Sequence, residues 1–499
     1  MLSRIVLAPI SYFETTPLGR ILNRFTYDVE VVDLRLTESM SVLMIASSWF
    51  IAGLCIMCSI LPWIALALGP ITFAYGVMLL HYRKTGADLQ RIDALTRSPI
   101  QAMLSEGADG ASTIRVFRQG LNFLKRFRVS TDTNSAALLN FISAQRWLGI
   151  RIELLGSLVA LVSTTMVVSL NDVLRLQPGL IALLIMWSSN FTITLAFFVD
   201  AFGESEAAIT SIERVDAMAT LPIEKSMATS SNIVLPKSWP EHGLVEFDNV
   251  CLRYRDGLPL ALNGLSFVIE PGKRCGVVGR TGAGKSTLTI ALFRLAELES
   301  GRCLIDGVDL STLGLSDVRG RLSIIPQDPF LFSGTLRECI DPFGSSEDRI
   351  ILEALEAVRL AKPDSGLDLL ESIVEEGGRN YSVGERQLLC LARALLAKPK
   401  VLVMDEATAS VDGETDAFIQ RMLRTRFKGT TLLTVAHRLN TIMDYDSILV
   451  MDKGRAAEFG SPQDLLERNG VFAELVASTG EESSRALREI ALASSSLEV

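Results

Sequence analysis

The chain has 499 residues, 48% of them hydrophobic, and a net charge of −9. This length allows about three domains, and the acidic balance argues against a nucleic-acid-binding protein, because such proteins usually carry a basic stripe. The seven cysteines are scattered, which is typical of reduced cytosolic thiols rather than of a disulfide framework. The apolar residues are concentrated before residue 200. We therefore expect a membrane part followed by a soluble part.

The first part of the chain contains four apolar runs. They follow a segment, 1–36, that is too polar to span a bilayer, and they cover residues 38–61, 63–82, 148–170 and 179–199. Each run is long enough to cross about 30 Å of hydrocarbon as a helix. The stretch 83–147 is rich in Arg and Lys, so the positive-inside rule places it in the cytoplasm. We expect an all-α transmembrane bundle of about four spans, since the alternative, a soluble helical bundle, would have to bury all of these runs.

The pattern of the sequence changes after residue 203. Residues 203–242 form a polar connector, and short β-runs that alternate with helices follow from Gly243, which is the α/β pattern. The serine-rich tail is expected to be disordered. We place the domain boundaries at 1–220 for the membrane domain, 221–242 for the linker, 243–480 for the α/β domain and 481–499 for the tail.

The clearest motif is the P-loop at Gly279–Ser286, which reads G-x-x-x-x-G-K-S. An apolar run at 273–278 predicts a strand before it, and 286–295 predicts a helix after it; a chance glycine-rich turn would lack this context. Backbone N–H groups then close around β- and γ-phosphates at the helix N-terminus. Lys285 should reach these phosphates and Ser286 should bind Mg²⁺. The expected nucleotide contacts are Gly279, Thr281, Gly282, Ala283, Gly284, Lys285, Ser286 and Thr287.

A second acidic element follows the P-loop at Val401–Glu406, where an apolar strand ends in two carboxylates. Asp405 is placed to hold Mg²⁺ through water, and Glu406 is placed to polarise the attacking water as a general base. Acidic residues that merely cap a strand end are the alternative. In a chain that also carries a P-loop, the pair favours nucleotide hydrolysis.

Between these two elements lies Ser382-Val383-Gly384-Glu385, and this segment resembles the signature motif of ATP-binding cassette (ABC) transporters. The resemblance implies an α/β P-loop ABC cassette that uses ATP and Mg²⁺, and it implies roles for residues outside the P-loop. The implied roles are adenine stacking for Tyr254, contact with Mg²⁺ and the membrane domain for Gln327, nucleotide contact for Ser382 and Gly384, a loop that crosses the dimer for Asp412, and γ-phosphate contact for His437.

Three segments are similar to the second half of subfamily C, the multidrug-resistance-associated type: FETTPLGRILNRF, SEGADGASTIRVF and SVGERQLLCLARALL. The resemblance covers about residues 1–480. It implies a multi-pass exporter in which ATP binding and hydrolysis drive alternating access for a small molecule. The membrane would be the plasma or vacuolar membrane, with the nucleotide domain in the cytoplasm. Segment 1–36 and the middle of 83–147 would supply the coupling helices.

The sequence departs from this pattern in three places. The predicted spans are fewer than a full membrane domain contains, so its first spans and the whole first half are expected on a missing N-terminal half or on a separate chain. Val383 stands where glycine would let the backbone approach the γ-phosphate, and Glu385 adds negative charge there. Phe197 and Asp200 stand where the subfamily carries a Trp and an Arg used for organic anions, which disfavours a multiply anionic substrate.

We expect the chain to work with a second ABC half that carries an intact Ser-Gly-Gly-Gln signature. One alternative is a nucleotide-gated regulatory or channel-type subunit of the same subfamily, in which nothing is pumped. Another is an incomplete half-transporter that is inactive without a partner. A soluble ABC ATPase that acts on DNA or translation would need soluble helices and a basic surface, and the sequence shows neither.

Overall fold

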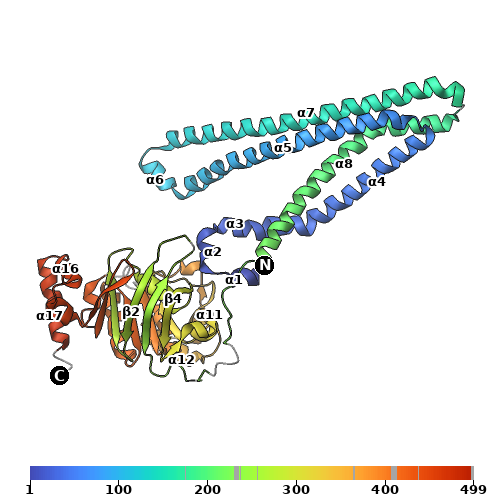
Figure 1. Ribbon diagram of the computed structural model, residues 1–499. Coiled ribbons are helices and arrows are strands. Elements are labelled where there is room, and N and C mark those ends of the chain that lie inside the picture. The colour runs from blue at the N-terminus through green and yellow to red at the C-terminus, as the bar shows by residue number, and fades with distance from the viewer. Residues whose placement is uncertain are drawn as a thin grey trace. The chain divides into compact units, whose positions relative to one another are not determined.

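The computed structural model describes residues 1–174, 176–229, 235–236, 238–255, 257–362, 366–405, 413–436 and 438–495. The chain divides into two compact units, which we call the helical unit (Gly19–Thr220) and the α/β unit (Met1–Leu18 with Leu221–Val499) (Figure 1). The first residues therefore group with the α/β unit, which differs from the predicted boundary. One reason is a backbone hydrogen bond of 2.8 Å from the Glu224 N–H to the Leu7 carbonyl.

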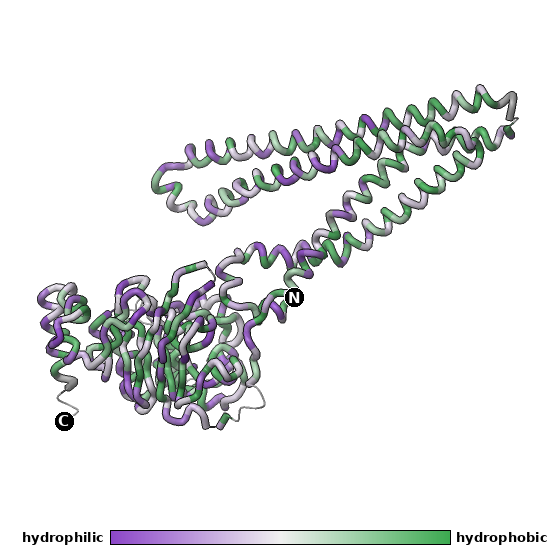
Figure 2. The backbone as a smooth tube through the Cα atoms, viewed as in Figure 1, coloured by the Kyte–Doolittle hydropathy of each residue, from purple (hydrophilic) through white to green (hydrophobic). Residues whose placement is uncertain are grey.

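The helical unit consists of long helices joined by short turns. In the part of the chain that the structure describes, four helical stretches are long and apolar enough to cross a membrane. They confirm the predicted spans, and the hydrophilic residues gather toward the end where α5 and α7 meet α6 (Figure 2). The elements are α3 (Leu18–Asn23), the π-helical turns η1 (Arg24–Asp28) and η2 (Val31–Arg35), α4 (Leu36–Ile60), α5 (Ile64–Asp109), α6 (Ala111–Val116), α7 (Gly120–Leu174) and α8 (Pro178–Ala219).

These helices pack in pairs, α4 with α8, α5 with α7, and α7 with α8. Their small core contains the fully buried Met57 and Leu184. Large apolar side chains such as Phe73, Leu161 and Val168 remain exposed along the same helices. An apolar surface of this kind suits contact with lipid, where the helical backbone satisfies its own hydrogen bonds.

One fully buried carboxylate joins the start of the helical unit to its end. Asp28, in η1, accepts hydrogen bonds from Ser211 at 3.0 Å and from Arg214 at 3.5 Å, both on α8, and it also pairs with Arg24. A buried charge is tolerated when it is paired and hydrogen-bonded in this way. Segment 1–36, which the sequence shows to be too polar to span a bilayer, is thus mostly helical, and its Asp28 is bonded to α8.

The α/β unit is built on two larger sheets. The first is antiparallel, with β1 (Val245–Leu252), β2 (Leu262–Ile269), β4 (Leu298–Ile305) and β5 (Val308–Asp309) in the order β2-β1-β4-β5. The second contains β3 (Arg274–Gly279), β6 (Leu322–Ile325), β9 (Val401–Asp405), β10 (Thr431–Val435), β11 (Ser447–Asp452) and β12 (Arg455–Gly460) in the order β12-β11-β3-β10-β9-β6. A short ribbon pairs β7 (Gly334–Thr335) with β8 (Ile373–Val374).

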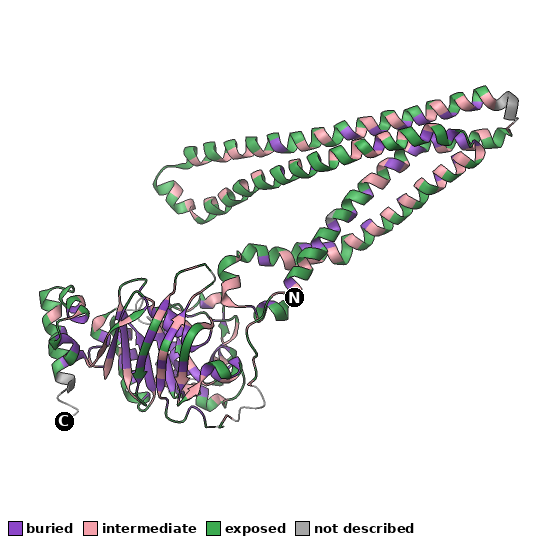
Figure 3. Cartoon of the chain, in the orientation of Figure 1, coloured by how far each residue is buried: buried purple, intermediate pink, exposed green. Residues whose placement is uncertain are grey.

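The second sheet is parallel except for β12, which runs antiparallel to β11. Its central strand β10 is buried along its whole length, and Figure 3 shows that buried residues are concentrated in the strands of the α/β unit. Parallel strands covered on both faces read as continuous apolar runs, which explains why β9 stands out so clearly in the sequence. The fold class predicted from the sequence, a transmembrane helical bundle followed by an α/β P-loop cassette, is confirmed.

Short helices surround these sheets. Two apolar clusters form the core, one containing the stacked Phe247 and Phe267 of the antiparallel sheet and the other Phe472 with the helices around it. The helices are α1 (Leu2–Val6), α2 (Ile10–Thr15), α9 (Lys285–Leu292), η3 (Leu310–Thr312), α10 (Leu315–Arg319), α11 (Leu336–Ile340), α12 (Asp348–Ala357), η4 (Leu367–Leu369), η5 (Glu376–Gly378), α13 (Val383–Ala397), α14 (Gly413–Arg426), η6 (Leu439–Thr441), α15 (Pro462–Glu467), α16 (Val471–Ala477) and α17 (Glu481–Ser495).

The prediction of a disordered tail is wrong for the residues that form α17. Leu487 and Ala491, one helical turn apart, are buried in the core cluster that α15 and α16 also line. A serine-rich composition does not show this, because two well-placed apolar residues are enough to dock a short helix on an existing core.

One carboxylate, that of Asp306, accepts several backbone hydrogen bonds from the segment just before β1. Asp306 accepts backbone N–H groups from each of the residues 241–244, at 2.7–3.0 Å. Burial by itself would raise the pKa of this carboxyl, but the backbone donors outweigh it and hold the pKa below its ordinary value of 3.8. Trp239 adds a hydrogen bond of 3.0 Å from its indole N–H to the Ile305 carbonyl.

We predict that Asp306→Ala loosens this segment by about 1–3 kcal/mol, because four backbone N–H groups lose a charged acceptor. The measurement is hydrogen exchange of the amides of residues 241–244 in the full chain. Asp306→Asn, which keeps one acceptor oxygen, should lose less. Since the folded pKa is lowered, the wild-type advantage should hold above pH 4 and shrink as the pH falls through the folded pKa. An Ala variant with wild-type exchange at neutral pH would contradict this account.

Candidate functional site

The P-loop lies between β3 and α9 in the α/β unit. β3 ends at Gly279 and α9 begins at Lys285, so the loop joins a buried strand to the N-terminus of a helix. Gly284 caps α9 with a φ of +97°, and a Cβ at this position would lie 2.7 Å from the Ala261 carbonyl oxygen. Glycine is therefore required here, both for the left-handed backbone and for the close approach. The free N–H groups at such a helix start form an anion site.

The Lys285 side chain is held over this loop. Its Nζ donates to the Gly279 carbonyl at 2.9 Å, and the residue is only 7% exposed. A buried ammonium needs such partners. The charge is thus fixed beside the backbone donors, where a phosphate can replace the carbonyl as its partner.

The structure brings the acidic strand to the P-loop helix. β10 pairs in parallel with both β3 and β9, and Val435 lies opposite Val277 on one side and opposite Asp405 on the other. The carboxyl ends of these strands therefore lie at one edge of the sheet. There the Ser286 hydroxyl donates to an Asp405 carboxylate oxygen at 3.3 Å. Ligands of open α/β sheets bind at this edge.

The paired hydroxyl and carboxylate fit Mg²⁺, which prefers oxygen ligands and takes few of them from protein when phosphates are present. Among the described residues, no group of three or more His, Cys, Asp and Glu side chains could hold a metal by itself.

Tyr254 follows β1 and is anchored to the P-loop helix. Its hydroxyl and the Thr287 Oγ1 are 2.9 Å apart and hydrogen-bonded. The ring is half-buried, so part of it remains open to a ligand. The predicted adenine-stacking residue is therefore within reach of α9.

The signature segment forms the start of α13. Ser382 caps the helix by accepting the Glu385 N–H at 3.3 Å, and the Glu385 carboxylate accepts the Ser382 N–H at 2.8 Å. This reciprocal pair is a capping box. The charge of Glu385, which we expected to act near phosphate, thus has a local partner at the helix N-terminus.

Comparison with known proteins agrees with these features. Residues 1–195 match the family model of the ABC transporter transmembrane region, and residues 262–409 match the ABC transporter model. The chain belongs to the ABC transporter family. It is therefore an ATP-binding protein with a multi-pass membrane region, and its α/β unit contains the ABC cassette.

The relatives that it resembles belong to subfamily C. Rat ATP-binding cassette sub-family C member 2 is 42% identical over 473 residues, which cover 95% of this chain and 30% of the rat protein. The human protein of the same name is 41% identical over 473 residues, or 95% of this chain and 30% of its own. ABC transporter C family member 12 of Dictyostelium discoideum is 40% identical over 490 residues, or 98% and 37%. The chain thus spans about a third of the length of these relatives.

A residue that sequence reasoning missed links two parts of the cassette. Gln387 of α13 is almost fully buried, and its Nε2 donates to the backbone carbonyl of Gln327 at 3.4 Å. Gln327 itself is exposed just after β6. A polar residue next to an apolar helical run, Leu388–Leu389, was the available signal, because buried amides require partners.

Three predicted residues, Glu406, Asp412 and His437, lie outside the described residues, and their roles remain predictions. They follow elements that are described, since β9 ends at Asp405 and β10 at Val435. In the helical unit, Phe197 and Asp200 are both exposed on α8. The expectation about anionic substrates therefore stays a prediction as well.

We predict that Tyr254→Ala weakens ATP binding by about 1–3 kcal/mol, the scale of base–aromatic stacking. Tyr254→Phe should keep most of the affinity, because it retains the ring and loses only the hydrogen bond to Thr287. A titration of each full-length variant with a fluorescent ATP analogue in the presence of Mg²⁺ measures both effects. Equal weakening by the two substitutions would show that the hydroxyl, not the ring, carries the contact.

We also predict that Glu385→Ala destabilises the first turn of α13 by about 0.3–1.5 kcal/mol, whereas Glu385→Gln costs less because Gln can close the same capping box. Hydrogen exchange of the amides of residues 382–386 reports the difference. If both variants lose the same protection, the charge at the helix N-terminus matters and the side-chain hydrogen bond does not.

Proposed function

We propose that the chain forms part of an ATP-driven exporter of small molecules, in which ATP binding and hydrolysis drive alternating access. The observation that carries this proposal is the meeting of Ser286 with Asp405 at the end of the parallel sheet, in one chain with four helices of membrane-spanning length among its described residues. The relatives that are 40–42% identical are members of the same subfamily. The Arg- and Lys-rich stretch 83–147 supports a cassette on the cytoplasmic side of the membrane. We propose that this membrane is the plasma or vacuolar membrane.

The residues divide the work of hydrolysis. Lys285 and the loop N–H groups orient the β- and γ-phosphates, while Ser286 and Asp405 would hold Mg²⁺, with Gln327 as a further contact. The bound ion would neutralise charge that develops on the phosphate oxygens. Glu406 would accept the proton of the attacking water, and His437 would contact the γ-phosphate.

We predict that Glu406→Gln keeps ATP binding but lowers hydrolysis by about a hundredfold or more, because the general base is lost while the P-loop remains. ATP turnover and ATP binding are measured on the same purified preparation, in a complex with the partner described below. Turnover near the wild-type rate would overturn the assignment of Glu406.

We further propose that a second ABC cassette, with an intact Ser-Gly-Gly-Gln signature, completes the site. In such a pair each ATP lies between the P-loop of one cassette and the signature of the other, and Asp412 would contribute to the loop that crosses between them. Here the signature carries Val383, whose β-branched side chain stands where glycine would allow a close backbone approach. Two copies of this chain would therefore pair each P-loop with the altered signature.

The chain alone should bind ATP and hydrolyse it slowly, and a co-expressed ABC half with an intact signature should raise the rate. The measurement is ATP turnover of the chain with and without that half, each repeated with Glu406→Gln to subtract contaminating activity. Fast turnover by the chain alone, abolished by Glu406→Gln, would show that it assembles with itself and that the altered signature is adequate.

A further inference from the structure

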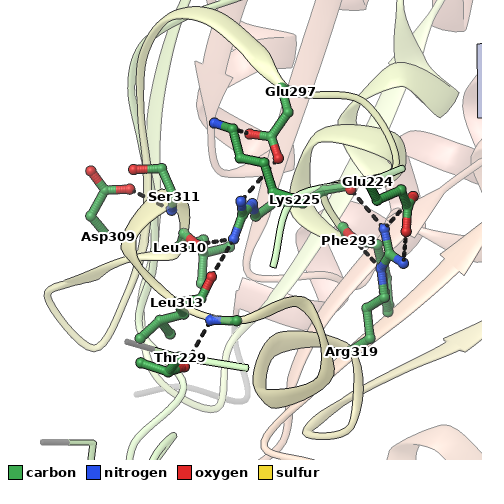
Figure 4. A network of polar contacts seen from close by, with 12 residues as sticks. Glu224, Lys225, Thr229, Phe293, Glu297, Asp309, Leu310, Ser311, Leu313 and Arg319 are labelled. Carbon is green, nitrogen blue, oxygen red and sulfur yellow. Dashed lines mark hydrogen bonds and ion pairs between the residues drawn. The ribbon is translucent and has the colours of Figure 1, made fainter. Parts of the chain in front are cut away.

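The part of the connector that follows α8 is bound to the segment at the C-terminal end of α9, the P-loop helix. Figure 4 shows Arg319 between Glu224 of the connector and Phe293, which follows the last residue of α9. A second contact runs from Lys225 of the connector to Glu297 at 3.1 Å. We call Glu224, Lys225, Arg294, Glu297 and Arg319 the connector clamp.

Arg319 joins the two sides of the clamp. Its guanidinium donates to the Glu224 carboxylate with two bonds, at 2.7 and 2.9 Å. The same group donates to the carbonyls of Phe293 at 3.1 Å and Arg294 at 2.8 Å. The last carbonyls of a helix have no partner within the helix, and a cation there also opposes the negative end of the helix dipole. The connector carboxylate and the end of α9 are therefore held by one planar, rigid group.

Arg294 is placed at some conformational cost. It follows α9 with a φ of +47°, at a position where helices usually carry glycine. Its side chain is only 4% exposed and donates to the carbonyls of Leu310 and Leu313, each at 2.7 Å, and to Glu297 at 2.9 Å. Glu297 therefore bridges a buried arginine of the cassette and Lys225 of the connector.

The rest of the connector lies directly on the cassette backbone. A Cβ on Gly314 would lie 2.3 Å from the Thr229 nitrogen, so only glycine admits the connector here. The Gly314 N–H donates to the Thr229 hydroxyl at 2.7 Å, and the Leu315 N–H donates to the Ser226 carbonyl at 3.1 Å. These bonds fix the part of the connector that directly follows the clamp.

In the sequence, the clamp residues lie after α8, a helix of membrane-spanning length, and after α9, the P-loop helix. α8, the last helix of membrane-spanning length, ends at Ala219, a short segment before Glu224. α9 is a single eight-residue helix that begins with the phosphate-binding Lys285. A cavity of about 840 Å³ is lined both by clamp residues and by Tyr254. The clamp therefore contacts the segment just after α9 and also lines the cavity that Tyr254 lines.

We propose that the Glu224–Arg319 pair is a positioning device that couples nucleotide occupancy of the P-loop to the connector and so to α8. Phosphate bound at the start of α9 would shift this helix as a rigid body, and the carbonyls of Phe293 and Arg294, directly after it, would carry Arg319 and Glu224 with them. Neither residue is among the expected nucleotide contacts. This inference rests on the proposed use of ATP by the site.

Hydrogen exchange on the full chain, with and without saturating MgATP, tests the coupling. In the wild type, ATP should slow exchange both in peptides that cover residues 285–295 and in those that cover 221–229. In Glu224→Gln, the first set should still be slowed and the second should lose the effect, and ATP affinity should fall about fivefold or more. Glu224→Asp, which keeps the charge, should restore part of the response.

Asp248→Asn is the matched control, because Asp248 forms an exposed ion pair with Arg302 at 2.8 Å, on β1 and β4 and outside the clamp. It should respond to ATP as the wild type does, with a similar thermal stability to Glu224→Gln. Lys225→Gln breaks only the more exposed ion pair of the clamp, so it should fold even if Glu224→Gln does not, and it should lose part of the connector response.

Two results would overturn the proposal while leaving ATP binding intact. In the first, ATP slows hydrogen exchange in the wild-type peptides that cover 285–295 but not in those that cover 221–229. In the second, ATP slows exchange in the 221–229 peptides of Glu224→Gln and Lys225→Gln as much as in the wild type. If ATP does not slow hydrogen exchange in the wild-type peptides that cover 285–295, the result contradicts the proposed function and the coupling that rests on it.

Discussion

The nucleotide site depends on the parallel pairing of β10 with both β3 and β9. Neither the P-loop nor the acidic strand would form the proposed site alone, because the backbone donors of the loop suit phosphate and the carboxylate suits a metal ion. One buried strand between them sets their separation and aligns their ends. The hydrogen bond from Ser286 to Asp405 is the direct result of this order of strands.

The connector that follows α8 is held on the cassette, within the α/β unit, by several hydrogen bonds. The connector is not a free tether, since Arg319, Gly314 and Asp306 each bind a different part of the segment between α8 and β1. Ordering the connector costs conformational entropy, which these hydrogen bonds help to offset. They also restrict how far the connector can move. Movement of the segment after α9 would therefore be transmitted to Glu224 of the connector through Arg319.

The two units meet opposite demands from their surroundings. The cassette buries its strands on both sides and leaves its polar loops at the edge of the sheet. The long helices keep large apolar residues exposed, which would be unfavourable in water but is suited to hydrocarbon. Asp28 is a buried charge within the helical unit, and its two arginine partners and one serine compensate for its burial.

Much of this protein follows from its sequence because the deciding interactions are local. The P-loop is a contiguous run whose glycines and Lys285 work within a single turn, and each membrane span is a continuous apolar helix. The capping box of Glu385 is equally local and could have been predicted from its spacing to Ser382, although we assigned that charge to the phosphate.

The tertiary structure decided what depends on distant partners. Ser286 meets Asp405, and Glu224 meets Arg319, only because strand order and connector path bring remote segments together. The docking of α17 depends in the same way on a core that the tail does not encode. Composition shows which residues can pair, but strand order and the path of the chain decide which partners come within reach, because these contacts join residues that are far apart in the sequence.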